Sequence, residues 1–464
     1  MAEMLQPVTL EWFQDQDSDT RRETLQALAQ QGGDEAVEVL IAGLRDTHPG
    51  VQQEAVHGLI ASANRSVVQR LLGLLRDTTE VRNMAIEVIE QVLPENLETV
   101  VSSLHSPDPH VRKFVVDMFV KRCDPRAMSS LTALLSDPDP NVRASAAEAV
   151  GRLRARTAVP ALVNLLHDEE WVVFSVIEAL AAIGDPSALE PLLALSRESH
   201  GVVSAAAIEA IGDLERRGET LPMLVGLATS AGDDLRPAVI RTLVKLTEIS
   251  RTDVWARCHR DTWVPMLVAL LQDDELPTRV AAMTGLGLLG DRQGTQPIID
   301  MLRWLEQPSE EVMDQAVRAL VGTGETECLI EAVALEQEAV STMAIRALGQ
   351  LRALEAIPAL IGVRRTSQDW KRRRVALRSL AMMQSQEALA GLIEAINDET
   401  GYVRQVAVRL LGDCGHRPAL ANALTRLKSE RYQEVRDEIV NTVVRLGINE
   451  GVHEVLELMS HPRS

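Results

Sequence analysis

Few residues of this 464-residue chain have the spacing that catalysis or metal binding requires. Cys258 and His259 are adjacent, and consecutive side chains point apart on a helix, which suits neither a metal ion nor a nucleophile with its base. The chain also lacks a Gly-x-Ser-x-Gly sequence, a phosphate-binding glycine loop and a His-Glu-x-x-His sequence. We therefore predict no catalytic residue, no metal site and no cofactor.

Residue types that favour binding gather between residues 364 and 378, a segment with seven basic residues and one acid. It contains Trp370 together with Arg372, Arg373 and Arg374. Arg and Trp are enriched where the binding energy of interfaces concentrates. We interpret the segment as a site for an anion or an acidic protein, anchored by the tryptophan, and the alternative is a solvated turn and helix start.

A second candidate surface is a row of charged residues that recurs at one position of a repeated helix. The position lies opposite the apolar side of that helix, so these side chains should be exposed. Its acidic members are Glu87, Asp117, Glu148, Glu178 and Glu209, and its basic members are Arg241, Arg318, Arg346, Arg378 and Arg409. Because the sign changes once along the chain, we predict a groove of bipolar charge that binds a protein partner. Chance segregation or a role in solubility is the alternative.

The element that positions these residues is a repeat that runs almost from end to end. Its clearest copies are residues 139–151 and 401–412, and most copies follow one another at intervals of 30 to 34 residues. A fixed period of this size is typical of a solenoid. The anchor position of the repeat is occupied by Thr20, Val51, Val81, Val111, Val142, Val172, Val203, Leu235, Thr278, Val312, Val340, Arg372, Val403 and Val435.

Each repeat contains two short helices. Val142, Ala146, Val150 and Leu153 follow the 3.6-residue period of a second helix, and a shorter apolar helix precedes it in the repeat. Sequences such as 184–186, Gly-Asp-Pro, supply a glycine that ends one helix and an acid that begins the next. No stretch shows the alternation of a strand. We predict an all-α protein, an α-solenoid of about 14 helix pairs.

The repeat resembles HEAT repeats, specifically the short bacterial kind found in phycobilisome-lyase-like HEAT proteins, over about residues 10 to 460. HEAT units often carry an acid six residues before a basic residue, and these pairs form a ladder between neighbouring units. Pairs with that spacing are Asp15/Arg21, Asp137/Arg143, Asp273/Arg279, Asp398/Arg404 and Glu430/Arg436, whereas Val173, Ser204 and Met313 interrupt the ladder. The resemblance implies an armadillo-like helical fold whose second helices line the concave surface.

The period breaks once, where 43 residues separate Leu235 from Thr278. The excess falls around residues 248–263, which include Trp255 and Trp263. Insertions in solenoids often carry binding, so the two tryptophans are candidate partner contacts, although a tryptophan pair can equally fill a wedge between irregularly stacked units. We predict N-terminal repeats with the acidic row at 1–247, an insertion at 248–263 and C-terminal repeats with the basic row at 264–464.

Composition narrows the class of protein further. The net charge of −20 disfavours nucleic-acid binding, which depends on clustered Lys and Arg. The N-terminus lacks a basic start with an apolar core, and no apolar run reaches the ~18 residues of a membrane span, so we expect a cytoplasmic protein without a membrane partner. Cys123, Cys258, Cys328 and Cys414 lack CxxC spacing, which disfavours a disulfide framework or structural zinc.

Three classes of function remain. The first is a non-enzymatic scaffold or adaptor that binds protein partners, for which bacterial signalling would be a natural setting. The second, suggested by the repeat type, is a phycobilin-lyase-type enzyme or lyase accessory subunit, although aromatic residues form 3% of the chain and no aromatic bilin pocket is evident. The third is a nucleic-acid-binding HEAT protein. A fourth class, the HEAT-like iron enzyme deoxyhypusine hydroxylase, is excluded. That family binds iron through several His-Glu pairs, whereas this chain has only His453-Glu454.

Overall fold

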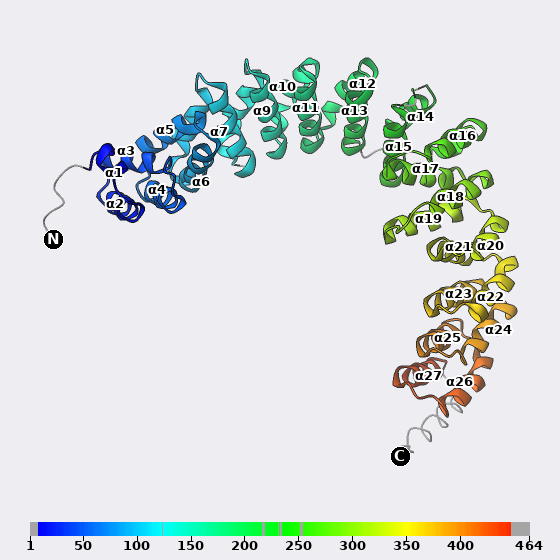
Figure 1. The fold of residues 1–464 in the computed structure, drawn as a ribbon. Helices are drawn as coiled ribbons and strands as arrows, with labels where there is room; N and C mark the ends of the chain where they lie inside the picture. Colours follow the sequence, from blue (N-terminus) through cyan, green and yellow to red (C-terminus); the bar gives the residue numbers. More distant parts are fainter. Residues whose placement is uncertain are drawn as a thin grey trace. The chain divides into compact units, whose positions relative to one another are not determined.

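The computed structural model describes residues 8–122, 124–215, 219–230, 232, 234–250 and 254–446. In these residues the chain forms α-helices joined by short turns and 3-10 helices, with no β-strand (Figure 1). The prediction of an all-α protein is therefore confirmed. Cys123 and the pair His453-Glu454 lie outside the described residues.

The chain divides into two compact units, residues 1–216 and 217–464, and we describe each unit by itself. The division lies at residue 216, whereas the sequence analysis placed the junction at the insertion 248–263. Unit 1 contains α1 (Leu10–Gln14), α2 (Ser18–Gln31), α3 (Asp34–Gly43), α4 (Pro49–Ala61), α5 (Arg65–Gly73), α6 (Thr79–Ser102), α7 (Pro109–Arg122), α8 (Met128–Ala133), α9 (Pro140–Arg152), α10 (Val159–Asn164), α11 (Glu170–Ile183), α12 (Leu189–Glu198) and α13 (Gly201–Leu214).

Unit 2 continues the same alternation of first and second helices. It contains α14 (Leu221–Ser230), α15 (Arg236–Ser250), α16 (Arg260–Leu270), α17 (Leu276–Leu289), α18 (Thr295–Arg303), α19 (Glu310–Thr323), α20 (Thr326–Val333), α21 (Glu338–Leu351), α22 (Ile357–Thr366), α23 (Trp370–Met383), α24 (Gln386–Ala395), α25 (Gly401–Asp413), α26 (Leu420–Leu427) and α27 (Gln433–Arg445). The anchor residues lie in, or directly before, the second helix of each repeat.

The helices of each unit form two layers. In unit 1, α9, α11 and α13 pack side by side in one layer, and α10 and α12 lie in the other (Figure 1). In unit 2, successive second helices from α15 to α27 pack against one another in the same way. Apolar side chains from both layers meet between them, where Val142, Ala146 and Val150 are fully buried. This arrangement is the predicted α-solenoid.

The ends of the helices form where the sequence predicted them. The Asp139 carboxylate accepts hydrogen bonds from the backbone N–H groups of Asn141 at 2.8 Å and Val142 at 3.3 Å, and Pro140 occupies the first turn of α9. Gly184 ends α11 in the left-handed region with φ 70°, a conformation that costs glycine little. Both caps follow the start and stop signals of the sequence.

Arginine–carboxylate pairs join neighbouring repeats in the predicted ladder. Arg143 donates to the Asp168 carboxylate of the next repeat at 2.6 Å and to the backbone oxygen of Asp137 at 2.9 Å. The Asp137 carboxylate in turn accepts from Arg112 of the preceding repeat at 2.6 Å. Hydrogen bonding from Arg143 lowers the pKa of Asp168. An acid six residues before the arginine therefore serves two repeats at once, through its backbone oxygen and through its carboxylate.

Candidate partner-binding surface

The charged row lies on the solvent side of the second-helix layer in both units. In unit 1, Glu87, Glu148, Glu178 and Glu209 are exposed and Asp117 is half-buried. Two of these acids have partners on their own helix, since Lys113 donates to Asp117 at 2.7 Å and Arg152 lies 3.2 Å from Glu148. All five acids of this row thus reach solvent, and pairing on the same helix offsets part of the charge of Asp117 and Glu148.

The basic row of unit 2 is neutralised to a greater extent. Arg241 donates to Glu275 at 3.0 Å and to the Thr278 hydroxyl at 2.6 Å. Arg346 donates to Asp314 at 2.6 Å, and Arg409 to Glu438 at 2.6 Å. The hydrogen bond with Glu438 raises the pKa of Arg409.

Two members of the basic row carry a charge that no described residue neutralises. Arg318 and Arg378 are exposed and have no hydrogen bond or ion pair within the described part of the chain. These two guanidinium groups are available to a partner, whereas Arg241, Arg346 and Arg409 would have to give up an existing contact. The predicted groove across the whole chain stays a prediction.

The basic segment 364–378 is mostly structural, which corrects its interpretation as one continuous site. Arg373 is 4% exposed and donates to the Asp398 carboxylate at 2.9 Å and to the backbone oxygen of Ser367 at 2.8 Å, so it belongs to the ladder. Arg372 donates to the Val333 backbone oxygen at 2.6 Å and to the Ser341 hydroxyl at 2.7 Å. Neither guanidinium group is free to bind a partner.

The remaining arginines of the segment differ in how far they are engaged. Arg364 and Arg365 both bind the Glu394 carboxylate, and burial lowers the pKa of Arg364. Arg374 lies over the Trp370 ring at 5.1 Å from its centroid. Trp370 itself is half-buried and stacks on Tyr402 with ring centroids 5.4 Å apart and planes inclined by 28°. The tryptophan is thus part of a small aromatic cluster between α23 and α25.

The two tryptophans of the insertion are core residues. Trp255 and Trp263 are each 2% exposed and pack edge to face with ring centroids 5.5 Å apart. The Trp255 indole N–H donates to the Thr247 hydroxyl at 3.2 Å, so its polar group is satisfied inside the protein. The interpretation of these rings as partner contacts is wrong, because neither reaches the surface, and they fill space between α15, α16 and α17.

The sequence analysis missed aromatic and apolar residues at the position directly before the anchor. Trp171 on α11 is 50% exposed, Val202 on α13 is 63% exposed, and Tyr402 on α25 is 63% exposed. This position precedes the charged row by seven residues, which is two turns, so both positions lie on one side of the helix. The signal that could have found these residues is an apolar side chain where the repeat otherwise places a polar one.

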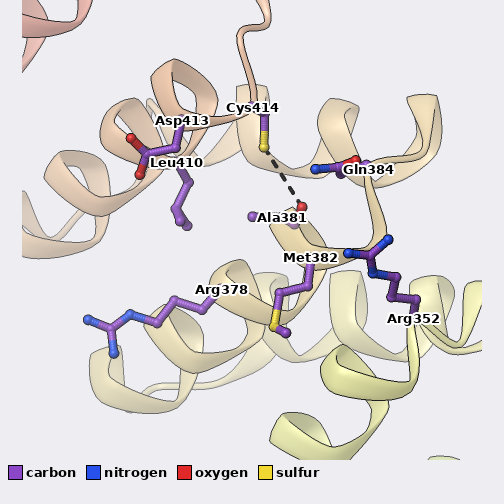
Figure 2. A pocket seen from close by; sticks show the side chains of 8 residues that line it. All are labelled: Arg352, Arg378, Ala381, Met382, Gln384, Leu410, Asp413 and Cys414. Carbon is purple, nitrogen blue, oxygen red and sulfur yellow. Dashed lines mark hydrogen bonds between the residues drawn. The ribbon is translucent and has the colours of Figure 1, made fainter.

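An open hollow of about 510 Å³ lies at the C-terminal ends of α21, α23 and α25 (Figure 2). Arg352, Arg378 and Gln384 line it together with the apolar side chains of Met382 and Leu410. None of these residues apart from Arg378 was singled out from the sequence.

The described residues offer little support for metal binding, for a reactive thiol at Cys258 or for a membrane span. No group of three or more His, Cys, Asp or Glu side chains among them could hold a metal ion. Cys258 is buried, and its thiol lies 3.6 Å from the Val254 backbone oxygen. None of the described helices is long and apolar enough to cross a membrane.

Comparison with known families agrees with this architecture. A family model described as HEAT repeats matches residues 7–90, 128–212, 301–381 and 363–443, which together make up more than half of the chain. The chain is a HEAT-repeat protein. The layer of second helices described above is therefore the second-helix layer of HEAT units.

Two curated relatives support the bacterial repeat type. The chain is 31% identical over 156 residues to the bilin biosynthesis protein PecE of Mastigocladus laminosus and, over the same length, to that of a Nostoc species. The match covers 33% of this chain and 54% and 57% of the two relatives, so the chain spans about half the length of the curated relatives it matches.

A solved structure with a similar fold is that of Kap95p bound to RanGDP. It is 14% identical, has a TM-score of 0.58 and covers 96% of this chain and 73% of its own. At this level of identity the likeness shows the fold alone.

Proposed function

We propose that this HEAT-repeat protein is a non-enzymatic scaffold that binds protein partners through the exposed side of its second helices. The observation that carries the proposal is the pair Trp171 and Tyr402, exposed at the same position of the repeat in different units. Exposed tryptophan and tyrosine are enriched where interfaces concentrate their binding energy. Solenoids offer such sides as extended binding surfaces.

The distribution of charge along the second helices supports the same surface as the binding site. The row reads acidic in unit 1 and basic in unit 2, with the change between Glu209 and Arg241, on either side of the division at residue 216. Opposite charges on a partner would speed association and set its orientation, and this contribution would fall with salt. Within the basic row, Arg318 and Arg378 contribute most to this attraction, because their charge is not already neutralised within the described chain.

The proposal is tested by capture from an extract of the source organism on the immobilised chain. Trp171→Ala and Tyr402→Ala are compared with Trp304→Ala. Trp304 is 84% exposed but follows α18, a first helix, and therefore lies outside the second-helix layer. We expect proteins retained by the wild type and by Trp304→Ala to be lost from the other two variants. Equal retention by all three variants would show that binding uses another surface.

The second candidate is a lyase-type protein that handles bilins, and the 31% identity to PecE favours it. If this chain acted on a bilin, mixing the purified protein with a free bilin should shift the visible absorption of the pigment. The scaffold proposal predicts an unchanged spectrum. A shifted spectrum that Trp171→Ala and Tyr402→Ala leave intact would favour the lyase-type function over the scaffold.

A further inference from the structure

The hollow in unit 2 combines positive charge with an apolar surface. It is bounded by the ends of three consecutive second helices, and Figure 2 shows the Met382 side chain between Arg378 on one side and Arg352 on the other. Met382 is 42% exposed, and Leu410 lines the same hollow. Methionine adapts its shape easily and is common on surfaces that bind peptides.

The charge of the hollow comes from two unpaired guanidinium groups. Arg352 and Arg378 have no hydrogen bond or ion pair in the ranges that the structure describes. The acid of the hollow, Asp413, is already paired with Arg445. Burial raises the pKa of the Cys414 thiol, which lies 3.8 Å from the Ala381 backbone oxygen, so this side chain adds no negative charge near neutral pH.

Two residues that line the hollow have an unfavourable backbone conformation. Arg352 and Gln384 end α21 and α23 in the left-handed region with φ of 52° and 51°. A side chain makes that conformation unfavourable, and other second helices end in glycine there, as α11 does at Gly184 and α19 at Gly324. Residues held in such conformations are enriched at binding and active sites. At these two helix ends both side chains line the hollow.

We propose that the hollow binds an acidic segment of a protein partner, with Arg352 and Arg378, on opposite sides of Met382 (Figure 2), each holding a carboxylate and with Met382 and Leu410 contacting an apolar side chain between them. The proposal rests on the scaffold function and adds the chemistry of the bound segment. Arginine is suited to carboxylates because it can donate two parallel hydrogen bonds. A chain with a net charge of −20 repels an extended phosphate backbone, whereas the carboxylates of a short segment interact mainly with the positive charge beside them, because more distant charges are screened.

The test uses the full chain and a random library of 12-residue peptides displayed on phage. Enriched peptides are synthesised with a fluorescent label, and their affinity is measured by anisotropy. We expect enriched peptides to combine acidic and apolar residues. Their affinity should fall at least about tenfold for Arg378→Glu and for Arg352→Gly, because each change removes a charge-assisted hydrogen-bonding group.

Arg154→Gly is the matched control. Arg154 lies two residues after the end of α9 in unit 1 with φ 51°, and the sequence around it, Leu153-Arg154-Ala155, matches Leu351-Arg352-Ala353. Both glycine variants relieve the same strain and should unfold at the same or a higher temperature than the wild type. Loss of binding by Arg352→Gly but not by Arg154→Gly therefore reports on the hollow and not on folding.

Several outcomes overturn the proposal. They are the absence of enriched peptides, enrichment of peptides without acidic residues, affinity that Arg378→Glu leaves unchanged, and binding of a 20-nucleotide single-stranded DNA that depends on Arg378. If extract proteins are still captured through Trp171 and Tyr402 in any of these cases, the scaffold function stands and only the hollow is refuted. If the capture of extract proteins depends on neither Trp171 nor Tyr402, the proposed function fails together with the proposal for the hollow.

Discussion

Replacing Glu430 by Gln should remove a pH-dependent part of the free energy of unfolding. Glu430 is 3% exposed and accepts hydrogen bonds from Arg404 at 2.7 Å, from Arg426 at 3.0 Å and from the Tyr432 backbone N–H at 3.1 Å. Burial raises the pKa of this carboxyl, but hydrogen bonds from Arg404, Tyr432 and Arg426 outweigh burial and lower the pKa from 4.5 to about 2.

The magnitude follows from the pKa difference between the unfolded and folded states. A lowered pKa stabilises the folded state above the unfolded value, and this stabilisation is lost as the pH falls through the folded value. At 1.36 kcal/mol for each pH unit, the contribution is about 3 kcal/mol near pH 7. It should fall to about half of that near pH 3 and vanish below pH 2, where the carboxyl is protonated in both states.

The assay is urea denaturation followed by circular dichroism at a series of pH values. We expect Glu430→Gln to unfold with a free energy about 3 kcal/mol below that of the wild type at pH 7, and the two curves to converge as the pH approaches 2. Glu434→Gln, which changes an exposed glutamate at the start of α27, is the control and should stay within about 0.5 kcal/mol. A difference between Glu430→Gln and the wild type that is independent of pH would refute the reasoning.

Two further substitutions test the packing. Trp255→Ala should lower the free energy of unfolding by about 3 to 5 kcal/mol, because it empties a buried site, whereas Trp304→Ala at the surface should change it by less than about 0.5 kcal/mol. Gly322→Ala should lower the melting temperature, because a Cβ there would lie 2.2 Å from the Gly287 backbone oxygen of the neighbouring second helix. Gly362→Ala, where a Cβ meets nothing within 4 Å, should raise it slightly.

The repeat period made the fold and the ladder predictable, because anchor residues and their acids recur at fixed spacing. The sequence could not separate structural arginines from free ones. Arg373 and Arg378 look alike in the chain, yet the acceptor of Arg373 is Asp398, 25 residues away in the next repeat. Arg378 lies on the same helix but has no hydrogen bond or ion pair in the described part of the chain, and only the packed structure shows this difference.

The insertion was ambiguous for a similar reason. Trp255 and Trp263 are rare residues at a break in the repeat, which favours binding as much as packing. The burial of each ring depends on how residues 255–263 pack against α15 and α17, and spacing alone does not determine that. Tyr402 was missed because we compared one position of each second helix, although the position two turns earlier lies on the same side.

Photo-crosslinking in cells tests the central claim most directly. A photoreactive phenylalanine analogue is placed at Tyr402, at Trp171 or at Trp304 in the full chain, and adducts are identified after irradiation. We predict that the first two positions yield the same crosslinked protein partners and that Trp304, which lies outside the second-helix layer, does not. Adducts at Trp304 alone, or no protein adduct at Tyr402 and Trp171, would contradict a partner-binding surface on the second helices.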